Sequence, residues 1–122
     1  MLALLGAQAQ LVKGPSSSQT PYLNISTAGV QIKSILTVGD VVPGGYKMVG
    51  LPDGAGAFDN GDGTFTMVVN HEIGNTVGAV RAHGSSGAFV SKWVIRKSDL
   101  TVLSGTDLIQ RLNLWDTLTS KY

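Results

Sequence analysis

The amino-acid sequence predicts an all-β protein made of short antiparallel strands and hairpins, and three observations support this. Sixteen of the 122 residues are glycine and only 14% are charged, a composition typical of strands separated by tight turns. Apolar and polar residues alternate in several short stretches, which allow roughly five to seven strands. No stretch has the period of a long amphipathic helix. Strands at this spacing are typical of a sandwich, a barrel or a propeller.

Two segments precede the β-rich region. The start, "MLALLGAQAQ", joins a short apolar run to Ala7-Gln8-Ala9, which fits the small-x-small pattern of a signal-peptidase site. We interpret residues 1–12 as the remnant of a signal peptide; a frayed or helical N-terminus is the alternative. Residues 13–29 contain "GPSSSQTPY" and are predicted to form an extended linker. Residues 30–122 are then the β-rich domain.

The first half of this domain is predicted to contain two strands and a loop. "VQIKSILTV", residues 30–38, has partial alternation and is followed by Gly39-Asp40, so it predicts a strand. "YKMVGL", residues 46–51, predicts a second strand, entered through the turn at 43–45. "PDGAGAF", residues 52–58, is interpreted as a glycine-rich loop that leads into the next strand.

The second half carries the strongest local signal. Asn60-Gly61-Asp62-Gly63 lies between apolar stretches and supplies the positive φ angles of a tight hairpin turn, with residues 64–70 as the second strand. "GAFVSKWVIRK", residues 87–97, alternates strictly and predicts another strand. Residues 98–105 predict a turn and a short strand. Residues 108–116 fit either a strand or a helical turn.

The strand over residues 64–70 ends in a candidate metal site. Because strand side chains alternate, Asn70 and Glu72 share one face, with Cα atoms roughly 6.5–7 Å apart, and His71 points to the other. A carboxylate and an amide oxygen are ligands of the calcium type. Calcium needs six to eight oxygens, so other segments would have to supply the rest. The alternative is a strand end whose polar side chains are simply solvated.

A second candidate site lies in "VRAHGSSGAF", residues 80–89. Alternation would place Arg81 and His83 on one face, where with the backbone of Gly84-Ser85-Ser86 they could bind an oxyanion. These two residues are the candidate catalytic pair. An ordinary polar loop is the alternative.

Composition argues against several other functions. The net charge is +1 with scattered basic residues, so the sequence predicts neither nucleic-acid nor membrane binding. No run reaches the roughly 18 apolar residues of a membrane span. The chain has no cysteine, which excludes disulfides, thiolate ligands and a cysteine nucleophile within it.

Five stretches together resemble, in order, the N-terminal region of PhoX-like secreted proteins: "GPSSSQTPY", "SILTVGD", "YKMVGLPDGAGAFDNGDGTFTMVVNHEIG", "VRAHGSSGAFVSKWVI" and "SDLTVLSGTDL". The resemblance runs from Lys13 to Trp115. The family consists of bacterial β-propellers and includes calcium- and iron-dependent alkaline phosphatases. The resemblance implies that this chain forms one to three propeller blades and is secreted or periplasmic. It also implies that Glu72, and less directly Asn70, binds calcium. The iron site of these phosphatases is expected to use a cysteine, which this chain lacks.

Two hypotheses of function follow. In the first, the chain is a fragment of a secreted metal-dependent phosphatase that hydrolyses phosphomonoesters; the fragment alone would be inactive, because most metal ligands would lie outside it. In the second, it is a non-catalytic β-module, structural or self-assembling, that associates through open strand edges.

Overall fold

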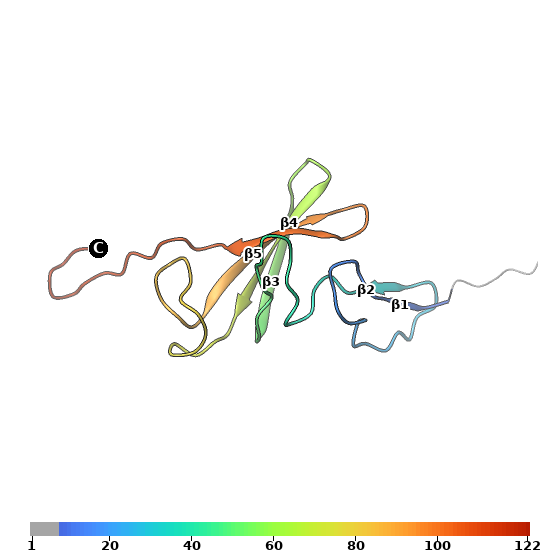
Figure 1. The fold of residues 1–122 in the computed structure, drawn as a ribbon, viewed down its shortest axis with the longest axis horizontal. Coiled ribbons are helices and arrows are strands. Elements are labelled where there is room, and N and C mark those ends of the chain that lie inside the picture. The colour runs from blue at the N-terminus through green and yellow to red at the C-terminus, as the bar shows by residue number, and fades with distance from the viewer. Residues whose placement is uncertain (1–7) are drawn as a thin grey trace, which may run out of the picture.

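Residues 8–122 are described by a computed structural model, and they form two β-sheets without a helix (Figure 1). The prediction of an all-β fold is therefore confirmed. The strands are β1 (Gln10–Val12), β2 (Gln31–Lys33), β3 (Pro52–Asp59), β4 (Thr64–His71), β5 (Phe89–Arg96) and β6 (Val102–Asp107). β1 and β2 form a small parallel pair, and the other four strands form an antiparallel meander in the order β3-β4-β5-β6. In Figure 1 the small sheet lies to one side of the meander, and the C-terminal segment projects on the other.

The predicted hairpin turn is the connection between β3 and β4. Gly61 and Gly63 have φ angles of 78° and 85°, which side chains with a Cβ disfavour. The Asp62 carboxylate accepts a hydrogen bond from the backbone N–H of Thr64 at 3.0 Å, and Asn60 N donates to Thr64 O at 3.2 Å. The local sequence therefore closes the turn by itself and fixes the register of the hairpin.

One face of the meander carries the core. Alternation on β4 and β5 directs Val69, Trp93 and Ile95 to this face, and Trp93 and Ile95 are fully buried. Val42 and Met48, from the irregular segment before β3, cover them. The domain is therefore a sheet with a layer of loop packed on one side, which explains how so few strands enclose a tryptophan.

One loop prediction and two strand predictions need correction. The supposed glycine-rich loop at 52–58 is strand β3; all its residues are exposed, so it lacks the apolar alternation by which strands are recognised. The predicted strand at 46–51 is irregular, with only an isolated bridge between Lys47 and Val41, because this segment serves as the cover of the core. The predicted strand at 30–38 is reduced to β2.

The N-terminal segment of the described chain forms a strand and packs on the domain, whereas the segment after β6 is irregular. β1 falls within the predicted signal-peptide remnant, whose first seven residues lie outside the described range, and it pairs with β2 across the predicted linker. In that linker, the buried Ser17 hydroxyl lies 2.8 Å from the Thr37 hydroxyl. The ambiguous residues 108–116 form neither a helix nor a named strand.

We predict that Gly105→Ala destabilises the domain. A Cβ at Gly105 would lie 2.5 Å from Tyr46 Cδ1 and 2.7 Å from the Trp93 ring, so two aromatic rings would have to move. The expected loss is about 1–3 kcal/mol in the free energy of unfolding, measured by urea denaturation. Gly50→Ala is the matched control, because a Cβ there meets no atom within 4 Å. Equal stability of the two variants would contradict this packing.

Candidate functional site

A β-bulge distorts the β3–β4 pair where the candidate metal residues lie. Pro52 pairs with His71 and Ala55 pairs with Val69, so two residues, Asp53 and Gly54, face Asn70 alone. Bulges redirect side chains and are common beside functional sites. Glycine fits the second bulge position because a Cβ there would come within 3.3 Å of Asn70 Nδ2.

The bulge borders an open pocket of about 370 Å³. Three of its lining residues carry side-chain oxygens: Asp53, Asn70 and Glu72. The structure thus brings together the two residues that the sequence singled out, both of them exposed, and adds Asp53 from the neighbouring strand. Sequence reasoning missed Asp53 because it was assigned to a loop; the Asp53-Gly54 step near the start of β3 was the available signal.

This donor set consists only of hard oxygen atoms. Two carboxylates and an amide oxygen fit calcium better than zinc, which favours nitrogen and sulfur ligands. Within residues 8–122 no group of three or more histidine, cysteine, aspartate or glutamate side chains is arranged to hold a metal ion. The three oxygen-bearing side chains are too few for a calcium shell on their own, and water or further protein oxygens would have to complete one.

Beneath the pocket, His71 turns into the core as alternation predicts. Its Nε2 lies 2.8 Å from the hydroxyl oxygen of Ser91, which also accepts a hydrogen bond from Trp93 Nε1 at 2.7 Å. His71 Nδ1 lies 3.4 Å from the carbonyl oxygen of Gly50, which can only accept. A proton on Nδ1 would satisfy this carbonyl, and Nε2 would then accept from Ser91, whose hydroxyl oxygen also lies 3.4 Å from the Val69 carbonyl oxygen. Burial lowers the pKa of His71 below its ordinary value, which keeps the ring neutral near pH 7.

Arg81 packs on the Phe89 ring, which in turn stacks on the His71 ring. The Phe89 ring is parallel to the His71 ring with centroids 4.3 Å apart, and the Arg81 guanidinium lies 3.7 Å from the Phe89 centroid. Arg81 also pairs with Asp107 at 3.6 Å. Burial and the Asp107 carboxylate, which accepts a hydrogen bond from Tyr46 Oη, strongly raise the pKa of Tyr46. Arg81 is thus already occupied by internal partners.

His83 does not join Arg81 on a strand face. The chain turns after Arg81, whose carbonyl oxygen accepts from Gly84 N at 2.9 Å, so strand alternation does not apply to this segment. His83 Nδ1 accepts a hydrogen bond from Ser85 N at 3.3 Å. Neither Arg81 nor His83 lines the pocket beside Glu72. The structure therefore does not bring the predicted catalytic pair to the predicted metal residues.

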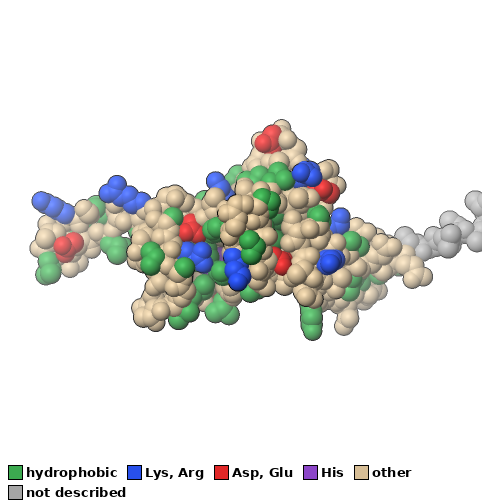
Figure 2. Space-filling view, in the orientation of Figure 1, with side chains coloured by type: hydrophobic (Ala, Val, Ile, Leu, Met, Phe, Trp, Pro, Cys, Tyr) green, Lys and Arg blue, Asp and Glu red, His purple; other side chains and the backbone are tan. Residues whose placement is uncertain are grey.

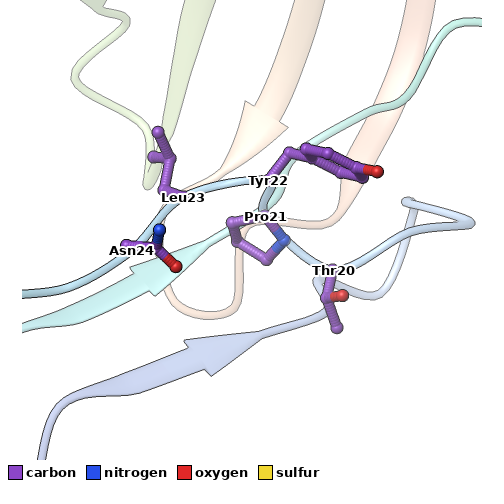
Figure 3. Close-up of a pocket in the computed structure, with 5 residues that line it drawn as sticks. All are labelled: Thr20, Pro21, Tyr22, Leu23 and Asn24. Carbon is purple, nitrogen blue, oxygen red and sulfur yellow. The ribbon is translucent and has the colours of Figure 1, made fainter.

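A second concavity, of about 350 Å³, is formed by five consecutive residues, Thr20 to Asn24 (Figure 3). The close-up shows their side chains pointing in different directions, and none carries a charge at neutral pH. It results from the curvature of one loop and offers no set of convergent groups for chemistry.

Comparison with known proteins adds no relative. The sequence matches no protein-family model, and searches of curated proteins and of solved structures return no match. Among the described residues, no helix has the length and apolar character to cross a membrane. On the face shown in Figure 2, basic and acidic side chains are interspersed. The resemblance to PhoX-like proteins thus remains a prediction from the sequence motifs.

We predict that the stability of the domain falls with pH from about 7 towards 5 because of His71. Its folded pKa is lowered, so the unfolded chain takes up a proton first as the pH falls, and stability is lost below the unfolded pKa of about 6.5. The nearby Arg81 reinforces this shift and Asp107 opposes it. The slope should reach at most about 1.4 kcal/mol per pH unit, measured by urea unfolding across this range.

The chain has only two histidines, which provides a matched pair of variants. His83→Gln should retain the pH dependence, whereas His71→Gln should remove it whatever its absolute stability. The assignment would be overturned if the dependence disappeared in His83→Gln and persisted in His71→Gln.

Proposed function

We propose that this chain forms a blade-like section of a secreted, calcium-dependent phosphatase that hydrolyses phosphomonoesters, of the PhoX-like kind. The meander of β3 to β6 supports this proposal, because propeller blades are four-stranded sheets of neighbouring antiparallel strands. The ordered motifs from Lys13 to Trp115, on which the resemblance to this family rests, also support it. One meander of this size corresponds to one blade.

The observation that carries the proposal is the convergence of Asp53, Asn70 and Glu72 on one open pocket. Asn70 lies in β4 and Glu72 directly follows its last residue, and Asp53 comes from the bulge that faces Asn70. A bound calcium ion would polarise a phosphoryl oxygen and stabilise the charge that develops during phosphoryl transfer. These three side chains would hold the ion through oxygens on two adjacent strands. Their two negative charges favour a divalent cation.

In this proposal Arg81 is the stronger candidate for contacting a bound phosphate, and His83 is the weaker one. Arg81 lies over Phe89, which lines the pocket, so its charge would be near a phosphate bound there, although Asp107 is its present partner. A phosphate bound there would compete with Asp107 for the guanidinium. His83 is hydrogen-bonded within its own turn and is the weaker candidate. The iron site of these phosphatases is expected to use a cysteine thiolate, and this chain contains no cysteine. Calcium is therefore the metal that we propose.

The second candidate is a non-catalytic β-module of structural or self-assembling type. Two observations favour it: Arg81 is already paired with Asp107, and no lysine or arginine of the described residues lines the pocket. The exposed edge strand β3 fits this candidate as well, since exposed edges pair with other strands. The two candidates differ in whether a phosphomonoester binds together with calcium.

We predict that calcium binds at this pocket and that Glu72→Gln weakens binding about tenfold, or about 1.4 kcal/mol. Glutamine keeps the shape of the side chain but removes a negative charge. Amide NMR shifts during calcium titration provide the measurement, and gadolinium in place of calcium should broaden the amides of Asp53, Asn70 and Glu72. Asp116→Asn is the control, because Asp116 does not line the pocket.

The same titration separates the two candidate functions. The phosphatase proposal expects phenyl phosphate to shift the amides around the pocket only when calcium is present. Equal calcium affinities for Glu72→Gln and Asp116→Asn would remove the metal assignment. Calcium binding without any response to phenyl phosphate would favour the non-catalytic module.

A further inference from the structure

The outer edge of β3 presents backbone groups in a defined pattern. Asn60 N donates to Thr64 O, so these two residues form a hydrogen-bonded pair of the antiparallel ladder. Every second pair repeats this arrangement, which makes Phe58 and Gly56 the residues bonded to β4. The N–H and C=O groups of the intervening residues, Asp59, Ala57 and Ala55, therefore point away from the sheet.

The hydrogen bonds between β4 and β5 independently give the same assignment of inward and outward backbone groups. Lys97 N donates to Gly63 O at 3.0 Å, so the odd-numbered residues of β4 bond to β5. The even-numbered residues of β4, including Thr66 and Val68, must then bond to β3. These are the partners of Phe58 and Gly56 in the observed register. Two hydrogen bonds at different places in the sheet thus assign the same outward groups to β3.

This edge is uncovered within residues 8–122, in contrast to the opposite edge of the sheet. All eight residues of β3 are exposed. On β6, the Ser16 hydroxyl accepts a hydrogen bond from Val102 N at 2.9 Å, and the Asp107 carboxylate accepts from Ala82 N at 2.8 Å. The β6 edge is thus occupied by other segments of the chain, while the β3 edge is available to a strand.

We propose that two copies of this protein pair through β3, antiparallel, with Ala57 on the two-fold axis. Ala57 then pairs with Ala57 of the second copy, and Ala55 pairs with Asp59 at both ends. All three outward-facing residues of each copy find partners, and the two meanders join into one eight-stranded sheet. Because the contact is isologous, it closes as a dimer and does not extend into a fibre.

The positions of the aspartates favour this register over the one with Gly56 on the two-fold axis. Placing Gly56 on the axis would set Asp53 directly opposite Asp59 of the second copy, and like charges in that position are destabilising. With Ala57 on the axis, Asp59 faces alanine. Its carboxylate is also compensated within its own copy by Lys97 Nζ at 2.5 Å.

The shapes of Phe58 and Gly56 favour the same register, and they favour a second copy of this chain as the strand that pairs with β3. Phe58, the next-to-last residue of β3, is 58% exposed. A Cβ at Gly56 would meet only the Val68 side chain within 4 Å, so the space above this glycine is open. The register sets Phe58 opposite Gly56 of the second copy, in a non-hydrogen-bonded pair where side chains approach closely. Each phenyl ring would then cover the other copy's glycine, a reciprocity that follows when the strand pairs with its own copy.

The absence of cysteine in the chain allows a direct test with single spin labels. In the dimer, the Cα atoms at position 57 lie about 5.5 Å apart, so an Ala57→Cys variant carrying a nitroxide should give a strongly broadened spectrum. Thr106→Cys is the control, because two β6 strands separated by seven strand spacings lie about 34 Å apart. Broadening at 106 but not at 57 would overturn the proposed surface.

Sedimentation of the unlabelled chain provides the second measurement. The wild type should sediment as a dimer at micromolar concentration, and Ala57→Pro should raise the dimer dissociation constant at least about tenfold. The proline removes an outward N–H that β4 does not use, so circular dichroism should remain that of the folded sheet. A monomeric wild type, or an Ala57→Pro variant that dimerises equally well, would overturn the proposal. Glu72→Gln should dimerise like the wild type, so the metal proposal and this one fail separately.

Discussion

The hydroxyl of Ser91 is the interaction on which the arrangement of this domain depends. It is fully buried on β5, accepts a hydrogen bond from Trp93 and shares one with His71 of the neighbouring strand. Buried polar groups are costly without partners, so these three side chains are compatible with burial only together. A slip of one residue between β4 and β5 would separate His71 from Ser91 and turn β4 over. The bond therefore fixes which face of β4 is the core.

That choice of face determines the position of the candidate site. With His71 inside, Asn70 and Glu72 must lie on the outer side, where the bulge brings Asp53 beside them. The same His71 ring supports Phe89, on which Arg81 rests. The pocket lining thus contains two exposed acidic side chains and a neutral, hydrogen-bonded histidine. A protonated His71 would add a positive charge beside a site that we propose for a cation.

Local signals in the sequence were sufficient for some elements and not for others. The turn at Asn60–Gly63 and the alternation along β4 and β5 depend on neighbouring residues, and both were predicted correctly. β3 was missed because an edge strand of glycine and alanine has no buried face to produce alternation. The cover of the core by Val42 and Met48 depends on contacts distant in sequence. Asp53 joins the site only through the bulge, and a bulge depends on how two strands pair.

Urea unfolding of Ser91→Ala, compared with Ser104→Ala, tests this account most directly. The alanine at position 91 leaves both Trp93 Nε1 and His71 Nε2 without their buried partner, at about 1–3 kcal/mol for each unsatisfied group. Ser104 lies on β6, is only partly buried and points to the other face of the sheet, so its replacement should change stability by less than about 0.5 kcal/mol. We predict a loss of about 2–6 kcal/mol for Ser91→Ala. Equal stabilities for the two variants would contradict the role of the Ser91 hydroxyl.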